Sequence, residues 1–299
     1  MPSPTEAAAT IDVGRRSVRL SGLRRPAIPR VGRWLTAEVI ATCALAIIVA
    51  LAALGPLLSP YSSIVPSGEA LLAPLSPGHP LGTDELGFDI LTRVLAGLRI
   101  TLFAAVVVTA VSVVVGLVIG TLAGWLGGWI DAVLMRATDL ILAFPATIVA
   151  MAIVASLGAG LTSSIIGIAI VWWPLYARLV RGEVRRAATG RHVEAAGLGG
   201  TRGIRLLIRH VLPAVGPTVV VTASMDIGGV VMTLAALAFI GLGSPAPAPE
   251  LGLMASAGME FILSAWWIAV VPGVAVAVLA LVCNYVGDGL RLALRSTGV

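Results

Sequence analysis

Long apolar runs constrain the fold of this chain more than any other feature of its sequence. Several reach the roughly 20 residues that an α-helix needs to cross about 30 Å of hydrocarbon. They are continuously apolar, whereas the strands of a membrane barrel would alternate. We therefore expect an all-α integral membrane protein with six transmembrane helices. The expected spans are Thr36–Leu58, Ile100–Leu122, Asp139–Leu157, Leu161–Val180, Val215–Leu242 and Trp266–Leu290.

Composition excludes several classes of function. The chain has 299 residues, 58% of them hydrophobic and only 12% charged, and all 20 basic residues are arginine. Because a Walker A loop needs a lysine, the chain cannot carry that ATP-binding motif. No nucleophile-elbow sequence is present, so we do not expect an enzyme. The three histidines, His79, His192 and His210, are too scattered for a metal site, and we expect no cofactor bound by this chain.

The chain divides at the first expected span. Residues 1–35 form an Arg-rich tail of polar composition, which we expect to be disordered. Residues 36–58 are the first transmembrane helix and residues 59–99 are a loop. Residues 100–295 then form a core of five further transmembrane helices, with a polar loop at 182–213. Cys43 and Cys283 fall inside expected spans, where we expect no disulfide.

The distribution of arginines along the chain predicts its orientation in the membrane. The tail, the turn at Asp131–Arg136, the loop at Arg178–Pro213 and the end of the chain carry most of them, whereas the other loops are acidic. The positive-inside rule places these arginine-rich segments, and both termini, in the cytoplasm. Flanking membrane spans explain the arginine clusters better than a nucleic-acid patch does. Tryptophans at expected span ends fit an interfacial belt: Trp125, Trp129, Trp266 and Trp267.

Small residues, prolines and one carboxylate mark positions inside the spans. Gly116, Gly120 and Gly124 share a helix face, which suits either a subunit interface or packing within one bundle. Three prolines inside expected spans predict kinks there, namely Pro145, Pro174 and Pro272. Asp139 is expected to open the third span, where the helix dipole favours a carboxylate.

The loop before the fifth span contains two expected short helices. Glu194 suits the start of the first, and Gly199–Gly200 offers its end. Thr201 is expected to cap the second, which Pro213 is expected to end. One face of that second helix is apolar and consists of Ile204, Leu207, Ile208 and Val211. The pattern fits a helix that docks into a partner's groove or a passive connector at the lipid surface.

The same loop resembles a known family motif. Glu194, Ala195, Ala196 and Gly200, followed by Leu212-Pro213, resemble the EAA loop of binding-protein-dependent ABC importer permeases. Further stretches are similar to the C-type permease of dipeptide, oligopeptide and nickel importers. These stretches are His79–Leu102, Ala236–Gly252 and Trp266–Leu294. The resemblance covers nearly everything after residue 35.

The resemblance implies a type I ABC importer permease in a bacterial inner membrane. It implies a homologous B-type permease as partner, two cytoplasmic ATPase subunits that hold ATP and Mg²⁺, and an extracytoplasmic substrate-binding protein. Peptides are the expected substrate, with nickel or another small solute as the alternative. The implied ATPase-coupling residues are Arg191, His192, Val193, Glu194, Ala195, Ala196 and Gly200. His192 replaces a usual aromatic residue, and Leu234 replaces a frequent glutamate.

Isolated polar residues leave alternatives open. Asp226 lies within the fifth span, where a carboxylate faces water or a partner. We place it in the translocation path with Met225 and Met232. A structural hydrogen bond is the alternative role, and a self-sufficient secondary transporter is the rival function. In the outer loop, a docking surface for the binding protein and a set of turn and capping residues are both open interpretations. The residues concerned are Gly82, Thr83, Asp84 and Asp89.

Overall fold

The structure is a computed structural model, and it describes residues 31–296, with side chains for 39–55 and 59–292. Within residues 31–296 it contains helices and no strand, which confirms the all-α prediction for that part of the chain. Most of the expected Arg-rich tail, residues 1–30, lies outside the described residues. The helices are α1 Val31–Leu58, α2 Ile90–Leu126, α3 Gly128–Leu142, α4 Ala146–Leu157, α5 Leu161–Ala188, α6 Arg191–Leu198, α7 Gly203–Leu206, α8 Leu212–Phe239, α9 Leu251–Gly258 and α10 Trp267–Ser296.

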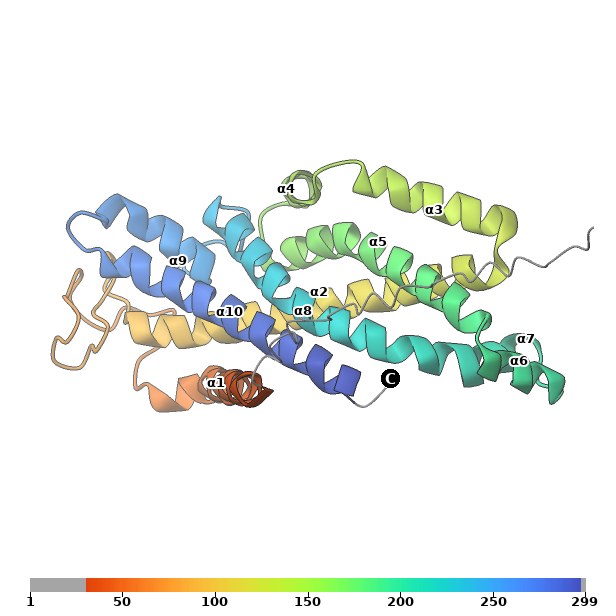
Figure 1. Ribbon diagram of the computed structural model, residues 1–299. Coiled ribbons are helices and arrows are strands. Elements are labelled where there is room, and N and C mark those ends of the chain that lie inside the picture. Colours follow the sequence, from red (N-terminus) through yellow and green to blue (C-terminus); the bar gives the residue numbers. More distant parts are fainter. Residues whose placement is uncertain (1–30, 297–299) are drawn as a thin grey trace, which may run out of the picture.

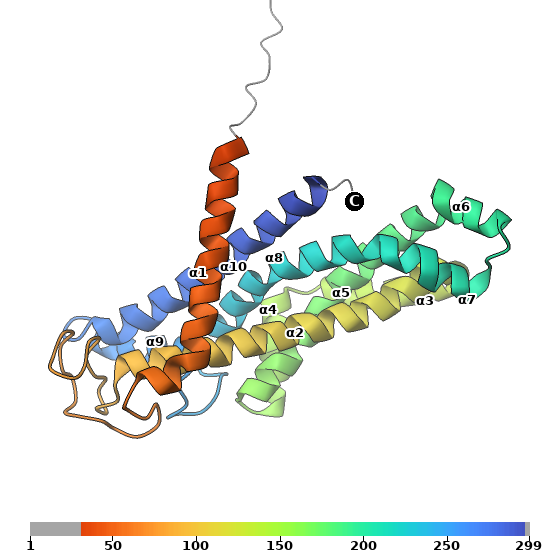
Figure 2. The same cartoon turned by 90° about the horizontal axis from the view of Figure 1, so that it is seen from below.

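The long helices form an elongated bundle with two different ends (Figure 1). The loop between α1 and α2 lies with α9 at one end, here called the loop end, and α6 and α7 lie at the other, the α6 end. Helix α1 diverges from the bundle axis (Figure 2). Among the described residues, α2, α5, α8 with its preceding segment, and α10 are apolar and long enough to span a membrane.

The seam between α2 and α5 is made by small residues. A Cβ atom at Gly116 would lie 2.3 Å from Cβ of Tyr176, and one at Gly120 would lie 2.5 Å from the Ala177 carbonyl oxygen. Gly124 faces the Arg181 carbonyl oxygen at 3.0 Å in the same way. The glycine stripe therefore packs within one chain, which is the second of the two interpretations of its sequence.

The expected third span is not one helix. It is replaced by α3 and α4, which are bent by 85° at a short break. Pro145 explains the break, because it disfavours the helical conformation of Phe144 before it. Pro174 and Pro272, in contrast, lie inside unbroken helices.

The break changes the place of Asp139. This residue lies in the last turn of α3, so the prediction that it opens a helix is wrong. Arg178 on α5 donates a hydrogen bond to its carboxylate at 2.6 Å. Arg181 and Arg185 donate to the buried Asp131 in the same way. These ion pairs tie α3 to α5, which no pattern in the sequence indicated.

Two other boundaries differ from the expected ones. Helix α2 begins at Ile90, so the loop ends at Asp89 and not at residue 99. The first turns of α2 contain polar residues, and for that reason the sequence predicted them as part of the loop. Arg93 is one of these residues, and it is buried. The second short helix does not stop at Pro213, because a π-helical turn, Leu207–Val211, carries it directly into α8. Thr201 does not cap it either, since the N-cap position belongs to Arg202.

The core and the surface fit a membrane environment. Buried apolar residues of α2, α4, α5, α8, α9 and α10 form one cluster, while large apolar side chains such as Phe103 and Val118 on α2 face outward. Trp129 and Trp266 are exposed, as a membrane-interface belt requires. Trp267 is different, because it is buried and its indole Nε1 donates to the Thr83 carbonyl oxygen at 3.3 Å. Cys43 and Cys283 are free thiols.

Candidate functional site

Val193 is the buried residue of helix α6 and packs it against the bundle. Val193 is 4% exposed and packs in a cluster that includes Val184 of α5 and Leu207 and Val211 of the π-helical turn. Glu194 lies in the first turn of α6, where the helix dipole favours a carboxylate, as predicted. The helix is therefore positioned at the end of the bundle with most of its surface free.

The other residues predicted for ATPase coupling form this free surface. Arg191, His192, Glu194 and Ala195 are exposed and Ala196 is half-buried. Gly200 has a φ of +88°, the left-handed conformation predicted for the end of the helix. The Thr201 backbone N–H accordingly donates to the Ala196 carbonyl oxygen at 3.0 Å.

Three exposed apolar residues extend this surface, and the sequence did not identify them as exposed groups. Leu198 is 87% exposed, Ile204 67% and Ile208 58%. The sequence placed Ile204 and Ile208 on the same face as Leu207 and Val211, but only the latter two are buried. Each pair is spaced by four residues and so shares a face, but the spacing by itself does not tell which of the two pairs is buried.

Asp226 lies at mid-height of the bundle on α8 and is half-buried. Its carboxylate interacts electrostatically with the buried hydroxyl of Tyr176 on α5. Asp226 therefore lies between α8 and α5 with a polar neighbour on α5.

The two methionines grouped with Asp226 differ in position. Met225 is half-buried and lies against α10, because a Cβ at Gly287 would come within 2.8 Å of its Cα. Met232 is 51% exposed, and six residues along a helix place it on a different face from Asp226. The structure thus does not bring Met232 to the same place. Leu234 is 3% exposed and belongs to the apolar core.

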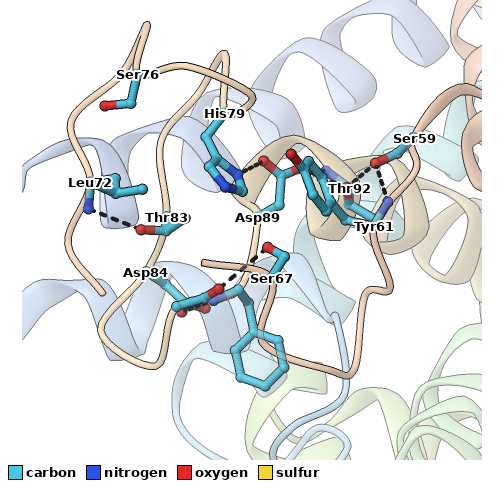
Figure 3. Close-up of polar contacts among 12 residues, drawn as sticks. Ser59, Tyr61, Ser67, Leu72, Ser76, His79, Thr83, Asp84, Asp89 and Thr92 are labelled. Carbon is cyan, nitrogen blue, oxygen red and sulfur yellow. Dashed lines mark hydrogen bonds and ion pairs between the residues drawn. The ribbon is translucent and has the colours of Figure 1, made fainter. Parts of the chain in front are cut away.

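Buried polar residues shape the outer loop (Figure 3). The Thr83 hydroxyl donates to the Glu69 carbonyl oxygen at 2.6 Å and accepts from the Leu72 N–H at 2.9 Å. Asp84 accepts from the Phe88 N–H at 2.9 Å, and Gly82 has a φ of +76°. Thr83 and Asp84 are buried, and their hydrogen bonds join segments of the loop in this structure.

Asp89 links the loop to the first turn of α2. One carboxylate oxygen accepts from the Thr92 N–H at 2.8 Å and from the Thr92 hydroxyl at 2.6 Å. The other oxygen is 2.9 Å from Nδ1 of His79, whose ring stacks on Tyr61. The hydroxyl of Ser59, which follows α1, is 2.5 Å from the Thr92 hydroxyl. The network therefore joins the end of α1, the loop and the start of α2 (Figure 3).

The sequence and the fold both match known transport proteins. Residues 116–296 match the family described as binding-protein-dependent transport system inner membrane component. The probable D,D-dipeptide transport system permease protein DdpC of Escherichia coli is 36% identical over 74% of this chain and 74% of its own length. The di/tripeptide transport system permease protein DppC of Pseudomonas aeruginosa is 37% identical over 83% of this chain and 84% of its own.

A solved structure of the methionine ABC transporter MetNI, in an inward-facing conformation, resembles the fold with a TM-score of 0.54. The likeness covers 67% of this chain and 95% of that one, at 20% identity. Among the described residues, no group of three or more His, Cys, Asp or Glu side chains is placed to hold a metal ion. From the family match, the two relatives and the fold, this chain belongs to the binding-protein-dependent inner membrane permeases of ABC transporters.

Proposed function

We propose that this chain is one permease subunit of an ATP-driven importer of di- or oligopeptides. It forms half of the translocation path with a homologous permease, receives its substrate from an extracytoplasmic binding protein, and depends on two cytoplasmic ATPase subunits. ATP and Mg²⁺ bind to those ATPases, since this chain has no lysine for a Walker A loop. The peptide transport permeases to which it is similar support the choice of peptides.

The observation that carries the proposal is the surface of α6 and α7. A short helix that buries Val193 against the bundle presents Glu194, Ala195 and the apolar Leu198 at the tip of the bundle. An exposed apolar group rimmed by charges is typical of a protein interface. A groove on an ATPase subunit accommodates such a helix because the alanine leaves room for close approach. Rigid motion of this element would then transmit closure of the ATPases to the bundle.

Two substitutions test the coupling role. Ala195→Glu and Leu198→Asp alter exposed side chains, so the bundle should fold and insert normally. We expect ATPase subunits to co-purify at least tenfold less with either variant, because a buried charge in the interface costs more than about 1.4 kcal/mol. Peptide uptake by transporters that carry either variant should fall as well.

Leu75→Asp is the matched control, because Leu75 is 88% exposed at the loop end. This variant should retain the ATPase subunits. If Ala195→Glu and Leu198→Asp both retained them with normal peptide uptake, the α6 surface would be a passive connector. If the complete wild-type transporter took up no peptide, the proposal that peptides are its substrates would be wrong.

We further place Asp226 on the path that the peptide follows. A carboxylate within a membrane-spanning segment is stabilised by water or by a cationic partner. A peptide with a free amino terminus supplies such a cation. The half-buried position of Asp226 beside the Tyr176 hydroxyl supports this role, because a carboxylate has several acceptor sites and can accept from a peptide ammonium in addition to that hydroxyl.

A further inference from the structure

A cavity at the loop end is separate from the α6 surface and from Asp226. Its volume is about 80 Å³, and it lies among the outer loop, the start of α2, the segment before α9, α9 itself and the start of α10. Its floor contains the buried Ile90, Arg93, Met254 and Ile268. Its rim contains the exposed Leu86, Ala246, Pro247 and Ala257. A ligand therefore reaches the buried floor from the surface.

Arg93 is an incompletely satisfied group in the floor. The residue is 6% exposed, and its guanidinium lies 4.5 Å above the Phe88 ring. Nη1 is 3.5 Å from the Asp84 carboxylate and Nη2 donates to the Ala248 carbonyl oxygen at 3.5 Å, so both contacts are long. Its buried Nε–H has no partner. An unpaired buried donor is unfavourable, and a ligand that accepts from it would remove that cost.

Glu85 supplies the matching acceptor. It lines the cavity and is near enough to Arg93 for a coulombic interaction, and its buried Oε2 atom has no hydrogen-bond partner. Asp84, Glu85 and Arg93 together carry a net charge of −1 in their ordinary ionised forms. The remaining walls are aliphatic. The cavity therefore favours a small ligand with one positive charge, one acceptor and an apolar side chain.

We propose that this cavity binds the amino-terminal residue of a peptide before the peptide enters the translocation path. The peptide ammonium pairs with the Glu85 carboxylate, and its first carbonyl oxygen accepts from the Arg93 guanidinium. The first side chain packs on Ile90, Met254 and Ile268. A volume of about 80 Å³ would hold several water molecules, so one small residue that displaces them fits. This assignment rests on the proposed function in peptide import.

Direct binding to the purified full-length chain in lipid nanodiscs, without any binding protein, tests the site. The probe is alanylalaninamide, and the comparison probe is its N-acetyl derivative, which lacks the ammonium group. We expect the free amine to bind at least tenfold more tightly. Equal affinity for the two probes, or no binding of alanylalaninamide, would overturn the proposal.

Two variants with matched controls locate the binding. Glu85→Gln removes the negative charge at a side chain whose Oε2 bonds to nothing, and it should weaken alanylalaninamide binding at least tenfold. Glu69→Gln alters an exposed glutamate of the same loop outside the cavity and should leave binding unchanged. Ala257→Phe fills the rim and should also weaken binding, whereas Met259→Phe, at an exposed position outside it, should not. Wild-type affinity in both Glu85→Gln and Ala257→Phe would overturn the assignment.

Peptide uptake by the complete transporter separates this inference from the proposed function. Uptake of peptides by the wild type without direct probe binding would reject the cavity alone. Failure of the wild type to take up any peptide, although alanylalaninamide binds as described, would reject the proposed transport of peptides and leave the binding site standing.

Discussion

Single buried polar side chains hold main-chain groups in place at the loop end. Thr83 bridges two segments of the loop, and Glu250, only 4% exposed, accepts from the Ser244 N–H at 2.5 Å. Such groups retain their place because an unpaired buried donor or acceptor costs more than the bond contributes. Asp226 differs from both, since it lies half-buried on a helix in the middle of the bundle. We propose that its carboxylate is available to a substrate.

Asp226→Asn should reduce uptake of peptides that have a free amino terminus about tenfold, the equivalent of about 1.4 kcal/mol. The reason is that an amide keeps the size of the side chain but does not attract the peptide ammonium. Initial uptake rates of radiolabelled alanylalanine measure the effect, and the amount of assembled transporter in the membrane is the control. Wild-type uptake kinetics in this variant would remove Asp226 from the path.

Glu250 should make the stability of the loop end depend on pH. Burial raises the pKa of its carboxyl group, and the Ser244 N–H opposes this only partly. The folded state therefore holds the proton to a higher pH than the unfolded chain does. Local stability is highest below the ordinary pKa of 4.5 and falls as pH rises through the folded pKa.

Hydrogen exchange of residues 243–258, corrected for intrinsic rates, measures this dependence. Protection should decrease as the pH is raised from about 4 through the shifted pKa, because the carboxyl group then loses its proton more readily in the unfolded segment. Glu250→Gln, which still accepts from Ser244, should abolish that dependence. Glu69→Gln, at an exposed glutamate of the outer loop, should retain it. A pH profile unchanged by Glu250→Gln would assign the effect to another group.

At the scale of elements, the contact of α2 with α5 organises the bundle. Glycines on α2 allow the two backbones to approach closely, and α3 is then fastened to α5 by ion pairs of Asp131 and Asp139 with arginines. The same helix α5 also carries the apolar residues against which α6 is anchored. Helix α5 thus connects the glycine seam with the proposed ATPase-docking surface.

Gly116→Ala should destabilise the protein by about 1–3 kcal/mol, because the added methyl group would lie 2.3 Å from Cβ of Tyr176 and force the helices apart. Gly182→Ala is the matched control on α5, since a Cβ there meets nothing within 4 Å. It should be neutral or stabilising by up to about 1 kcal/mol. Thermal unfolding in one detergent compares them, and equal midpoints would contradict the close seam.

The whole molecule has chemically different ends. The loop end carries acidic residues in an ordered network, and the α6 end carries exposed Arg202, Arg205 and Arg209. The arginine excess leads us to propose that the α6 end faces the cytoplasm. The arrangement of the bundle, with the two ends opposite each other, agrees with this proposal (Figure 1).

Labelling of single cysteines tests that orientation after Cys43 and Cys283 have been replaced by alanine. Val65→Cys at the loop end and Arg186→Cys near the end of α5, beside α6, both occupy exposed positions. A membrane-impermeant maleimide should label Val65→Cys in intact cells and Arg186→Cys only after permeabilisation. The opposite pattern would invert the proposed topology.

Much of the architecture was predictable from local sequence. Continuous apolar runs determined an all-α membrane protein, and Glu194 with Gly200 determined where α6 begins and ends. Both signals are local. The length of an apolar run, the dipole of a helix and the φ of a terminal glycine each act within one element. The EAA pattern in the same segment identified the family, which residues 116–296 match.

Other features depended on contacts between distant residues. Only the tertiary structure decided that Arg93 is buried within α2, that Asp139 pairs with Arg178, and that Thr83 and Asp84 face inward. The partners of these polar groups lie on other elements or in a loop that folds back on itself. The spacing of residues along the sequence therefore does not identify those partners. The partition of Leu207 and Ile208 into buried and exposed positions has the same cause. It is set by where α5 packs against the π-helical turn, a property of the assembled bundle.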